Sequence, residues 1–166
     1  PTANFGIFKS FDDAENFLKK SNYPIVIKAD GLAAGKGVYI SEDIKQATEA
    51  VKEIFNGKFG KADQILIEEY LIGEEMSFFV ISDGKHYKQF GTAQDHKRVY
   101  EGDKGPNTGG MGAYSPSRLE NEQLNNKILR EIIEPTLNGL KEQNINFIGF
   151  LYAGLMIVNG DPFLIE

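Results

Sequence analysis

The sequence predicts an α+β protein, and three observations support this class. Residues 1–71 alternate short strand-like runs with amphipathic helical segments. Residues 75–94 contain two strand-like runs around Asp83-Gly84, a pair favoured in tight hairpin turns. A helical pattern over residues 119–143 precedes two further strands.

Composition narrows the class of protein. The 166 residues, 41% hydrophobic and 25% charged, suffice for one core or two small lobes. No repeat or Ser-rich linker separates lobes, so the boundary is expected at the Gly73 turn, giving lobes 1–72 and 73–166. Pro1 in place of an initiator Met suggests a piece of a longer polypeptide.

Charge and cysteine usage indicate the environment. The net charge of -6 argues against a nucleic-acid partner. The absence of cysteine excludes disulfides and thiolate metal sites, and no apolar run is long enough to cross a bilayer. We therefore expect a cytoplasmic protein with no membrane partner, whose oligomeric state the sequence leaves open.

The first lobe should begin with a helix, because Ser10 followed by Asp13 resembles a capping box and apolar residues then recur to about Lys20. A β-branched strand over residues 24–28 leads into a glycine-rich loop, and strand character resumes at residues 38–40. Ser41 is expected to cap a helix that runs to Phe55. Residues 64–70 should form a strand, so that the lobe consists of βα units.

In the second lobe, the hairpin is followed by residues 95–116, which are polar and glycine-rich and predict a long functional loop. Pro135 lacks an amide proton and should kink or split the helix over 119–143. Two strands, residues 147–158 and 162–166, should be joined by a turn at Asn159-Gly160.

The glycine-rich loop is the first candidate site. Its small residues would let backbone amides approach phosphate oxygens, while Lys28 and Lys36 supply positive charge. Lys36 is followed by Gly37 and not by Ser or Thr, so the loop is not a Walker P-loop. A flexible hairpin with solvated lysines is the alternative.

Carboxylates flank a short hinge after the strand at residues 64–70. Glu68 and Glu75 could accept hydrogen bonds from an adenine amino group and from ribose hydroxyls. Strand alternation places Glu68 and Tyr70 on one face and Glu69 on the other. Glu69 belongs to the candidate set, although an exposed strand end is the alternative for it and for Glu74.

The order and spacing of Lys28, the DGLAAGKG loop and EEYLIGEE resemble the ATP-grasp fold, over nearly the whole chain. QDHKR at residues 94–98, GPNTGGMGAYSP at 105–116 and LYAGLM at 151–156 are similar to glycinamide ribonucleotide synthetases within that superfamily. The resemblance implies a small nucleotide-flap lobe and part of a larger antiparallel-sheet lobe.

The resemblance also implies site residues. ATP phosphates would be bound by Lys28 and Lys36, the adenine by Glu68 and the backbone of Leu71, and the ribose by Glu75. Lys97 and Arg98 would stabilise the charge of a substrate phosphate or acyl phosphate. For His96, an ordinary loop hydrogen bond is the alternative to proton transfer. Further cofactor-binding candidates are Gly35, Gly37, Glu69 and Tyr70. The substrate-binding candidates are Asp95, His96, Pro106, Asn107, Thr108, Gly109, Gly110 and Met111.

The implied reaction joins glycine to 5-phosphoribosylamine through a glycyl phosphate. Family members hold Mg²⁺ or Mn²⁺ with a Glu and, two residues later, an Asn; Glu166 matches the Glu, and the Asn position lies beyond the chain. This stretch alone is therefore expected to be inactive. The alternatives are another ATP-grasp carboxylate-amine ligase and a nucleotide-binding regulatory module.

Overall fold

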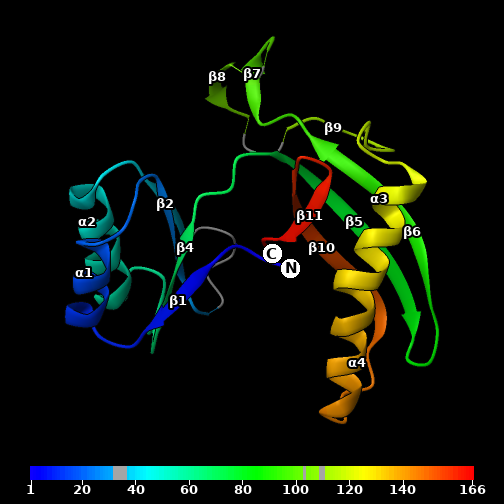
Figure 1. Ribbon diagram of the computed structural model, residues 1–166, viewed down its shortest axis with the longest axis horizontal. Helices are drawn as coiled ribbons and strands as arrows, with labels where there is room; N and C mark the ends of the chain where they lie inside the picture. Colours follow the sequence, from blue (N-terminus) through cyan, green and yellow to red (C-terminus); the bar gives the residue numbers. More distant parts are fainter. Residues whose placement is uncertain (32–36, 103, 109–110) are drawn as a thin grey trace. The chain divides into compact units, whose positions relative to one another are not determined.

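The computed structural model describes residues 1–31, 37–102, 104–108 and 111–166, with the backbone alone for residues 98, 104, 106 and 107. It confirms the α+β class (Figure 1). The chain divides into two compact units, and we call Ala3–Leu71 the first unit and Pro1–Thr2 with Ile72–Glu166 the second unit. None of the helices in the described ranges is long and apolar enough to span a membrane.

The first unit is a four-stranded sheet covered by two helices. Its strands, β1 (Phe5–Phe8), β2 (Ile25–Ala29), β3 (Val38–Ser41) and β4 (Ile65–Glu69), take the order β1-β4-β2-β3. Every neighbouring pair is antiparallel, so the expected βα units do not form a parallel sheet. The strand β1 was not predicted, because its four residues include a glycine and its partner β4 lies some sixty positions later in the chain.

Helices α1 (Phe11–Leu18) and α2 (Ile44–Phe55) pack on one face of this sheet. Ile25 and Ile27 of β2 join Ile65 and Ile67 of β4 in the buried core. Because side chains alternate along a strand, the residues between these isoleucines lie on the opposite face. That opposite face, which we call the open face of the first unit, carries Lys28 and Glu68.

The two helix starts test the capping predictions. The Ser10 side chain accepts a hydrogen bond from the Asp13 amide, which confirms the predicted start of α1. The prediction for α2 was wrong, because its N-cap is Asp43, whose side chain accepts from the Gln46 amide. Ser41 is instead the buried last residue of β3.

The second unit is built on a five-stranded antiparallel sheet with the order β11-β10-β5-β6-β9. The strands are β5 (Glu74–Asp83), β6 (Tyr87–Asp95), β9 (Ala113–Tyr114), β10 (Ile148–Val158) and β11 (Asp161–Leu164). Leu164 also accepts a hydrogen bond from Thr2 at its carbonyl and donates one from its amide to Pro1, so the first two residues extend this sheet.

The turns of this sheet follow the predictions closely. Asn159 and Gly160 join β10 to β11 with positive φ angles of 52° and 84°, which only asparagine and glycine adopt at low cost. The predicted β5–β6 hairpin is present, but its two loop residues are Gly84 and Lys85. Asp83 precedes the loop, and its carboxylate accepts from the Lys85 and His86 amides.

One face of the second-unit sheet is covered by α3 (Glu122–Ile128), the π-helical segment η1 (Leu129–Ile133) and α4 (Glu134–Glu142) (Figure 1). Phe78 of β5 and Leu155 of β10 are fully buried against them. Pro135 does not split the helical region: the π-helical segment ends at Ile133, the backbone stays helical through Glu134, and Pro135 is the second residue of α4, where its missing amide proton is tolerated.

Residues 95–116, predicted as one long loop, contain more regular structure than expected. Strands β7 (Arg98–Tyr100) and β8 (Lys104–Asn107) form a small two-stranded sheet. Strand β9 then pairs with the end of β6. The strands in this segment were not predicted, because glycines and prolines disfavour strands and their pairing here is set by the tertiary structure.

Candidate functional site

An ion pair occupies the open face of the first unit. Lys28 Nζ lies 2.8 Å from Glu68 Oε2, and Glu68 is buried. Both residues belong to the central strands β2 and β4, where Glu68 lies opposite Val26 and Lys28 lies opposite Leu66. A buried carboxylate requires a partner, and Lys28 provides it. The predicted phosphate-binding and adenine-binding residues are thus neighbours on one sheet face.

The other hinge residues take different positions. Glu69 Oε1 accepts hydrogen bonds from the Asn4 amide at 2.9 Å and from Asn4 Nδ2 at 3.0 Å. These bonds fasten the end of β4 to the beginning of β1, a structural use of Glu69 that sequence reasoning did not foresee. Tyr70 is exposed and Leu71 is half-buried. The nucleotide-binding role of all three stays a prediction.

Most of the glycine-rich loop, including Gly35 and Lys36, lies outside the described residues. Gly37 is described and buried, and its carbonyl accepts a hydrogen bond of 2.8 Å from the Ala29 amide. This bond extends the β2–β3 ladder to the point where the loop ends. Gly37 is therefore held in the sheet directly next to the Lys28–Val38 pair.

Lys97 is the centre of a charged cluster in the second unit. Its Nζ lies 2.6 Å from Glu75 Oε2 and 3.1 Å from Asp95 Oδ2. Partial burial alone would lower the pKa of Lys97, but hydrogen bonds and charge from Glu75 and Asp95 raise it above its ordinary value. Lys97 therefore carries a stable positive charge at neutral pH. A bound anion can replace one of the two carboxylates as its partner.

Two predicted substrate segments are brought together beside this cluster. Asp95 lies opposite Ala113 in the β6–β9 ladder, and the His96 amide donates to the Gly112 carbonyl at 3.0 Å. The Thr108 amide donates to the Lys97 carbonyl, also at 3.0 Å. The QDHKR and GPNTGGMGAY segments, separate in the sequence, thus form one hydrogen-bonded structure.

A cleft of about 510 Å³ opens at this structure. Three predicted substrate-binding residues line it, namely His96, Thr108 and Met111. The backbone of Arg98 pairs with that of Asn107 in the β7–β8 sheet, which also includes Pro106. Gly109 and Gly110 lie outside the described residues. The remaining lining of the cleft consists of Val99, Tyr100 and Glu101.

Glu166 is held by the strand beside it. Its carbonyl accepts a hydrogen bond of 2.9 Å from the Gly154 amide of β10. Hard divalent cations prefer oxygen ligands, and the Glu166 carboxylate is one. No group of three or more potential metal-binding side chains occurs among the residues that the structure describes. This donor set fits a metal that takes most of its ligands from a nucleotide and water, and it does not fit a closed protein cage.

Tyr152 is a residue near Glu166 to which sequence reasoning assigned no role. Burial raises the pKa of Tyr152, a hydrogen bond from Ser77 lowers it, and the charges of Glu166 and Glu75 raise it. The LYAGLM segment contained this tyrosine, and strand alternation with the buried Ala153 would have placed it on the sheet face away from the helices. Its neighbours on other strands could not be deduced from the sequence.

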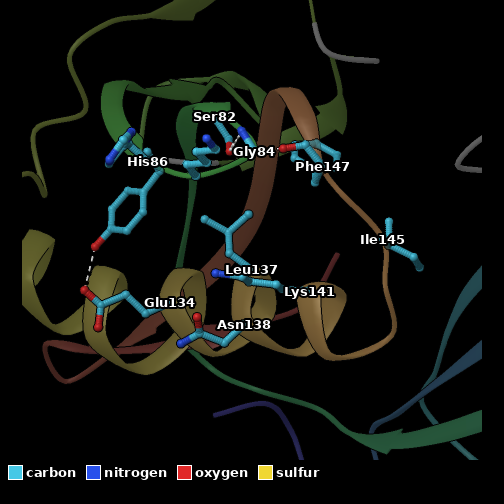
Figure 2. Close-up of a pocket in the computed structure, with 11 residues that line it drawn as sticks. Ser82, Gly84, His86, Glu134, Leu137, Asn138, Lys141, Ile145 and Phe147 are labelled. Carbon is cyan, nitrogen blue, oxygen red and sulfur yellow. Dashed lines mark hydrogen bonds between the residues drawn. The ribbon is translucent and has the colours of Figure 1, made fainter.

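A separate pocket of about 120 Å³ lies between the β5–β6 turn and α4 (Figure 2). Glu134 points from α4 toward the Tyr87 hydroxyl, which donates to its carboxylate at 2.5 Å. This hydrogen bond raises the pKa of Tyr87 to about 12. None of the predicted site residues lines this pocket, and it is too small for a nucleotide.

Solved structures define the class of the protein. The chain resembles a D-alanine–D-alanine ligase from Bacillus anthracis complexed with ATP, with a TM-score of 0.64, 17% identity and coverage of 99% of this chain and 49% of the other. A phosphoribosylamine–glycine ligase from Thermotoga maritima gives a TM-score of 0.87 and 36% identity, over 99% of this chain and 42% of the other. The fold is the ATP-grasp fold.

The particular family follows from sequence similarity. The chain belongs to the family described as "Phosphoribosylglycinamide synthetase, ATP-grasp (A) domain", which matches residues 1–166. It is 50% identical to a phosphoribosylamine–glycine ligase of Mesorhizobium japonicum and 48% identical to one of Brucella melitensis. In both comparisons the whole chain is covered but only 39% of the relative, so the chain spans about two fifths of their length.

Proposed function

We propose that this chain is the nucleotide-binding part of an ATP-dependent phosphoribosylamine–glycine ligase. The proposed reaction forms glycinamide ribonucleotide from 5-phosphoribosylamine, glycine and ATP. The observation that carries the proposal is the pairing of QDHKR with GPNTGGMGAY, which brings His96, Thr108 and Met111 to one cleft and bonds the Thr108 amide to the Lys97 carbonyl. These are the segments whose sequences resemble glycinamide ribonucleotide synthetases and not other ATP-grasp ligases.

The proposed chemistry has two steps. A glycine carboxylate oxygen attacks the γ-phosphorus of ATP, and ADP leaves with the electrons of the broken bond. The amine of phosphoribosylamine then attacks the glycyl carbonyl carbon, loses a proton and expels phosphate. An acyl phosphate reacts readily with an amine, so the protein need only align the reactants and neutralise charge. No covalent enzyme nucleophile is needed.

The charged pairs supply the neutralising groups in this proposal. Lys28 and Lys36 would contact the phosphates, Glu68 the adenine amino group, Leu71 the adenine edge through its backbone, and Glu75 the ribose. Their ion pairs support this assignment, because Lys28–Glu68 and Lys97–Glu75 each combine a donor and an acceptor that a nucleotide can engage.

The substrate side of the proposal rests on the second unit. Lys97 and Arg98 would stabilise the charge that develops on the phosphoryl group, and Asp95, His96 and residues 106–111 would bind glycine and phosphoribosylamine. Glu166 would hold Mg²⁺ or Mn²⁺, which supplies positive charge to the phosphate oxygens when bound. The cytoplasmic location and the absence of nucleic-acid and membrane partners stay predictions.

The test is product formation by the full-length protein. With ATP, glycine and phosphoribosylamine, we expect ADP release that depends on glycine, and glycinamide ribonucleotide detected by mass spectrometry. Nucleotide binding without any glycine-dependent turnover would favour a regulatory module. Turnover only with another carboxylate or amine would favour a different ATP-grasp ligase. Either result would refute the proposed function.

A further inference from the structure

The Tyr152 side chain lies over the strand beside the charged cluster of the second unit. Its ring is 5.6 Å, between centroids, from that of Phe79, the residue opposite it on β5. A methyl group at Gly154 would come within 2.7 Å of the Tyr152 hydroxyl oxygen and 3.2 Å of Cβ of Glu166. The hydroxyl is therefore positioned above Gly154, next to Glu166. It can take this position because Gly154 has no side chain.

The hydroxyl is a hydrogen-bond donor that still has its proton to offer. Ser77 lies directly across from Gly154 on β5, on the sheet face that carries the Tyr152 ring. Within the described ranges no carbonyl or carboxylate accepts the hydroxyl proton of Tyr152. Tyrosine has an ordinary pKa of about 10, so the group is protonated at neutral pH and offers a neutral donor there.

The surroundings favour an anion as the acceptor. Tyr152 is 45% exposed on the sheet face away from the helices, so a ligand can reach it. Glu75 lies opposite Met156 and therefore on the same sheet face as Tyr152, and it forms the ion pair with Lys97. The charges of Lys97, Glu75 and Glu166 also act on the Tyr152 hydroxyl. A neutral donor beside carboxylates adds no negative charge, and it can therefore hold an anionic oxygen that a further carboxylate would repel.

We propose that Tyr152 is a further substrate-binding residue, whose hydroxyl donates a hydrogen bond to an anionic oxygen of glycine or of the phosphoryl group that glycine receives. This inference rests on the proposed function and adds a residue to its reaction centre. Ser77 is the positioning residue, because it lies across from Gly154 on the sheet face that carries the hydroxyl. Gly154 is required because a side chain there would displace the hydroxyl.

The experiment is steady-state kinetics of the full-length protein with Tyr152→Phe, which removes only the oxygen. A hydrogen bond to a charged group is lost, so we expect a change of about tenfold to a hundredfold. A rise in the KM for glycine indicates contact with the glycine carboxylate. A fall in kcat at constant KM indicates contact with the phosphoryl group in the transition state. ATP affinity measured without glycine should stay unchanged.

Tyr87→Phe is the matched control, because it also removes a tyrosine hydroxyl, the one bound to Glu134, outside the candidate site. It should leave both kinetic constants unchanged, and Ser77→Ala should shift them in the same direction as Tyr152→Phe but by less. Wild-type kinetics in Tyr152→Phe, or an equal loss in Tyr87→Phe, would overturn the inference while leaving the proposed function intact. An inactive wild-type protein would overturn both.

Discussion

At the scale of single residues, the candidate site consists of charges that are already paired. Glu68 is buried against Lys28, and Lys97 lies between Glu75 and Asp95. A ligand that binds here must exchange these partners instead of meeting bare charges. Without a ligand, each pair compensates the charges of its own members. A nucleotide can replace these contacts, because its anionic phosphates suit the lysines and its amino group can donate to a carboxylate.

Lys97→Met in the full-length protein should separate function from stability. It keeps the aliphatic part of the side chain but removes the charge, so we expect turnover to fall by about a hundredfold or more. Because Lys97 is 39% exposed, the loss of its ion pairs should cost less than about 1 kcal/mol of unfolding free energy. The measurements are kcat and chemical denaturation.

Lys127→Met is the control for this substitution. Lys127 forms a comparable ion pair, 2.6 Å from Asp161, but outside the candidate site. It should leave turnover unchanged. Equal losses of turnover in the two variants would mean that Lys97 acts through the fold and not in the reaction.

The sequence predicted which residues are candidates for the site better than it predicted which residues contact one another. Lys28, Glu68 and Lys97 were selected as candidates because of their charge and motif. Their pairing was not foreseen, because Lys28 meets Glu68 only through the register of β2 on β4, which joins segments about forty residues apart. Tyr152 was missed for the same reason, since Ser77 lies on the neighbouring strand β5 and Glu166 lies just after the end of β11.

At the scale of elements, the β5–β6 turn offers a pH test. The pKa of the Asp83 carboxyl is held well below its usual range, mainly by hydrogen bonds from the His86 and Lys85 amides. A carboxyl with a lowered folded-state pKa stabilises the fold above its unfolded pKa of about 4, and this stabilisation is lost as the pH falls toward the folded value. Asp83→Ala should therefore be less stable than wild type at pH 7.

The measurement is the difference in thermal midpoint between wild type and Asp83→Ala at several pH values. It should be constant from neutral pH to about pH 5 and should shrink below about pH 4. Asp83→Asn should retain part of the stability at pH 7, since its side-chain oxygen still accepts from the amides. A difference that grows on acidification would contradict this account of the turn.

Local signals predicted the elements that local interactions determine. Ser10 caps α1 as expected, Asn159-Gly160 forms its turn, and Pro135 lies in the first turn of α4, directly after a change of helix type. The failures involve distant partners or competing local options. Strand β1 depends on β4, strand β8 contains glycine and proline, and the α2 cap moved from Ser41 to Asp43 because β3 uses Ser41 as its last residue.

At the scale of the whole molecule, the chain provides only part of what its relatives contain. It spans 39% of the length of the relative from Brucella melitensis. Glu166 is the predicted metal ligand within it, and a metal held by one carboxylate is placed loosely. We therefore expect a protein trimmed to these 166 residues to form no glycinamide ribonucleotide under conditions where the full-length protein does.

Calorimetry with ATP and an assay of glycine-dependent phosphate release, run on both proteins, would check this expectation. The trimmed protein should keep at most weak ATP binding, because displacing the reactants by even about 1 Å can cost a hundredfold in rate. Comparable turnover by the two proteins would contradict it and would assign the complete reaction to residues 1–166.

The central claim, that these residues bind ATP for a glycine ligase, is tested most directly by a crystal structure of the full-length protein with a non-hydrolysable ATP analogue, Mg²⁺ and glycine. The account predicts the adenine amino group at Glu68, the ribose at Glu75 and phosphates at Lys28 and Lys36, with the Lys28–Glu68 and Lys97–Glu75 ion pairs opened or re-formed around the ligand. A nucleotide bound elsewhere, with both ion pairs as they are here, would contradict it.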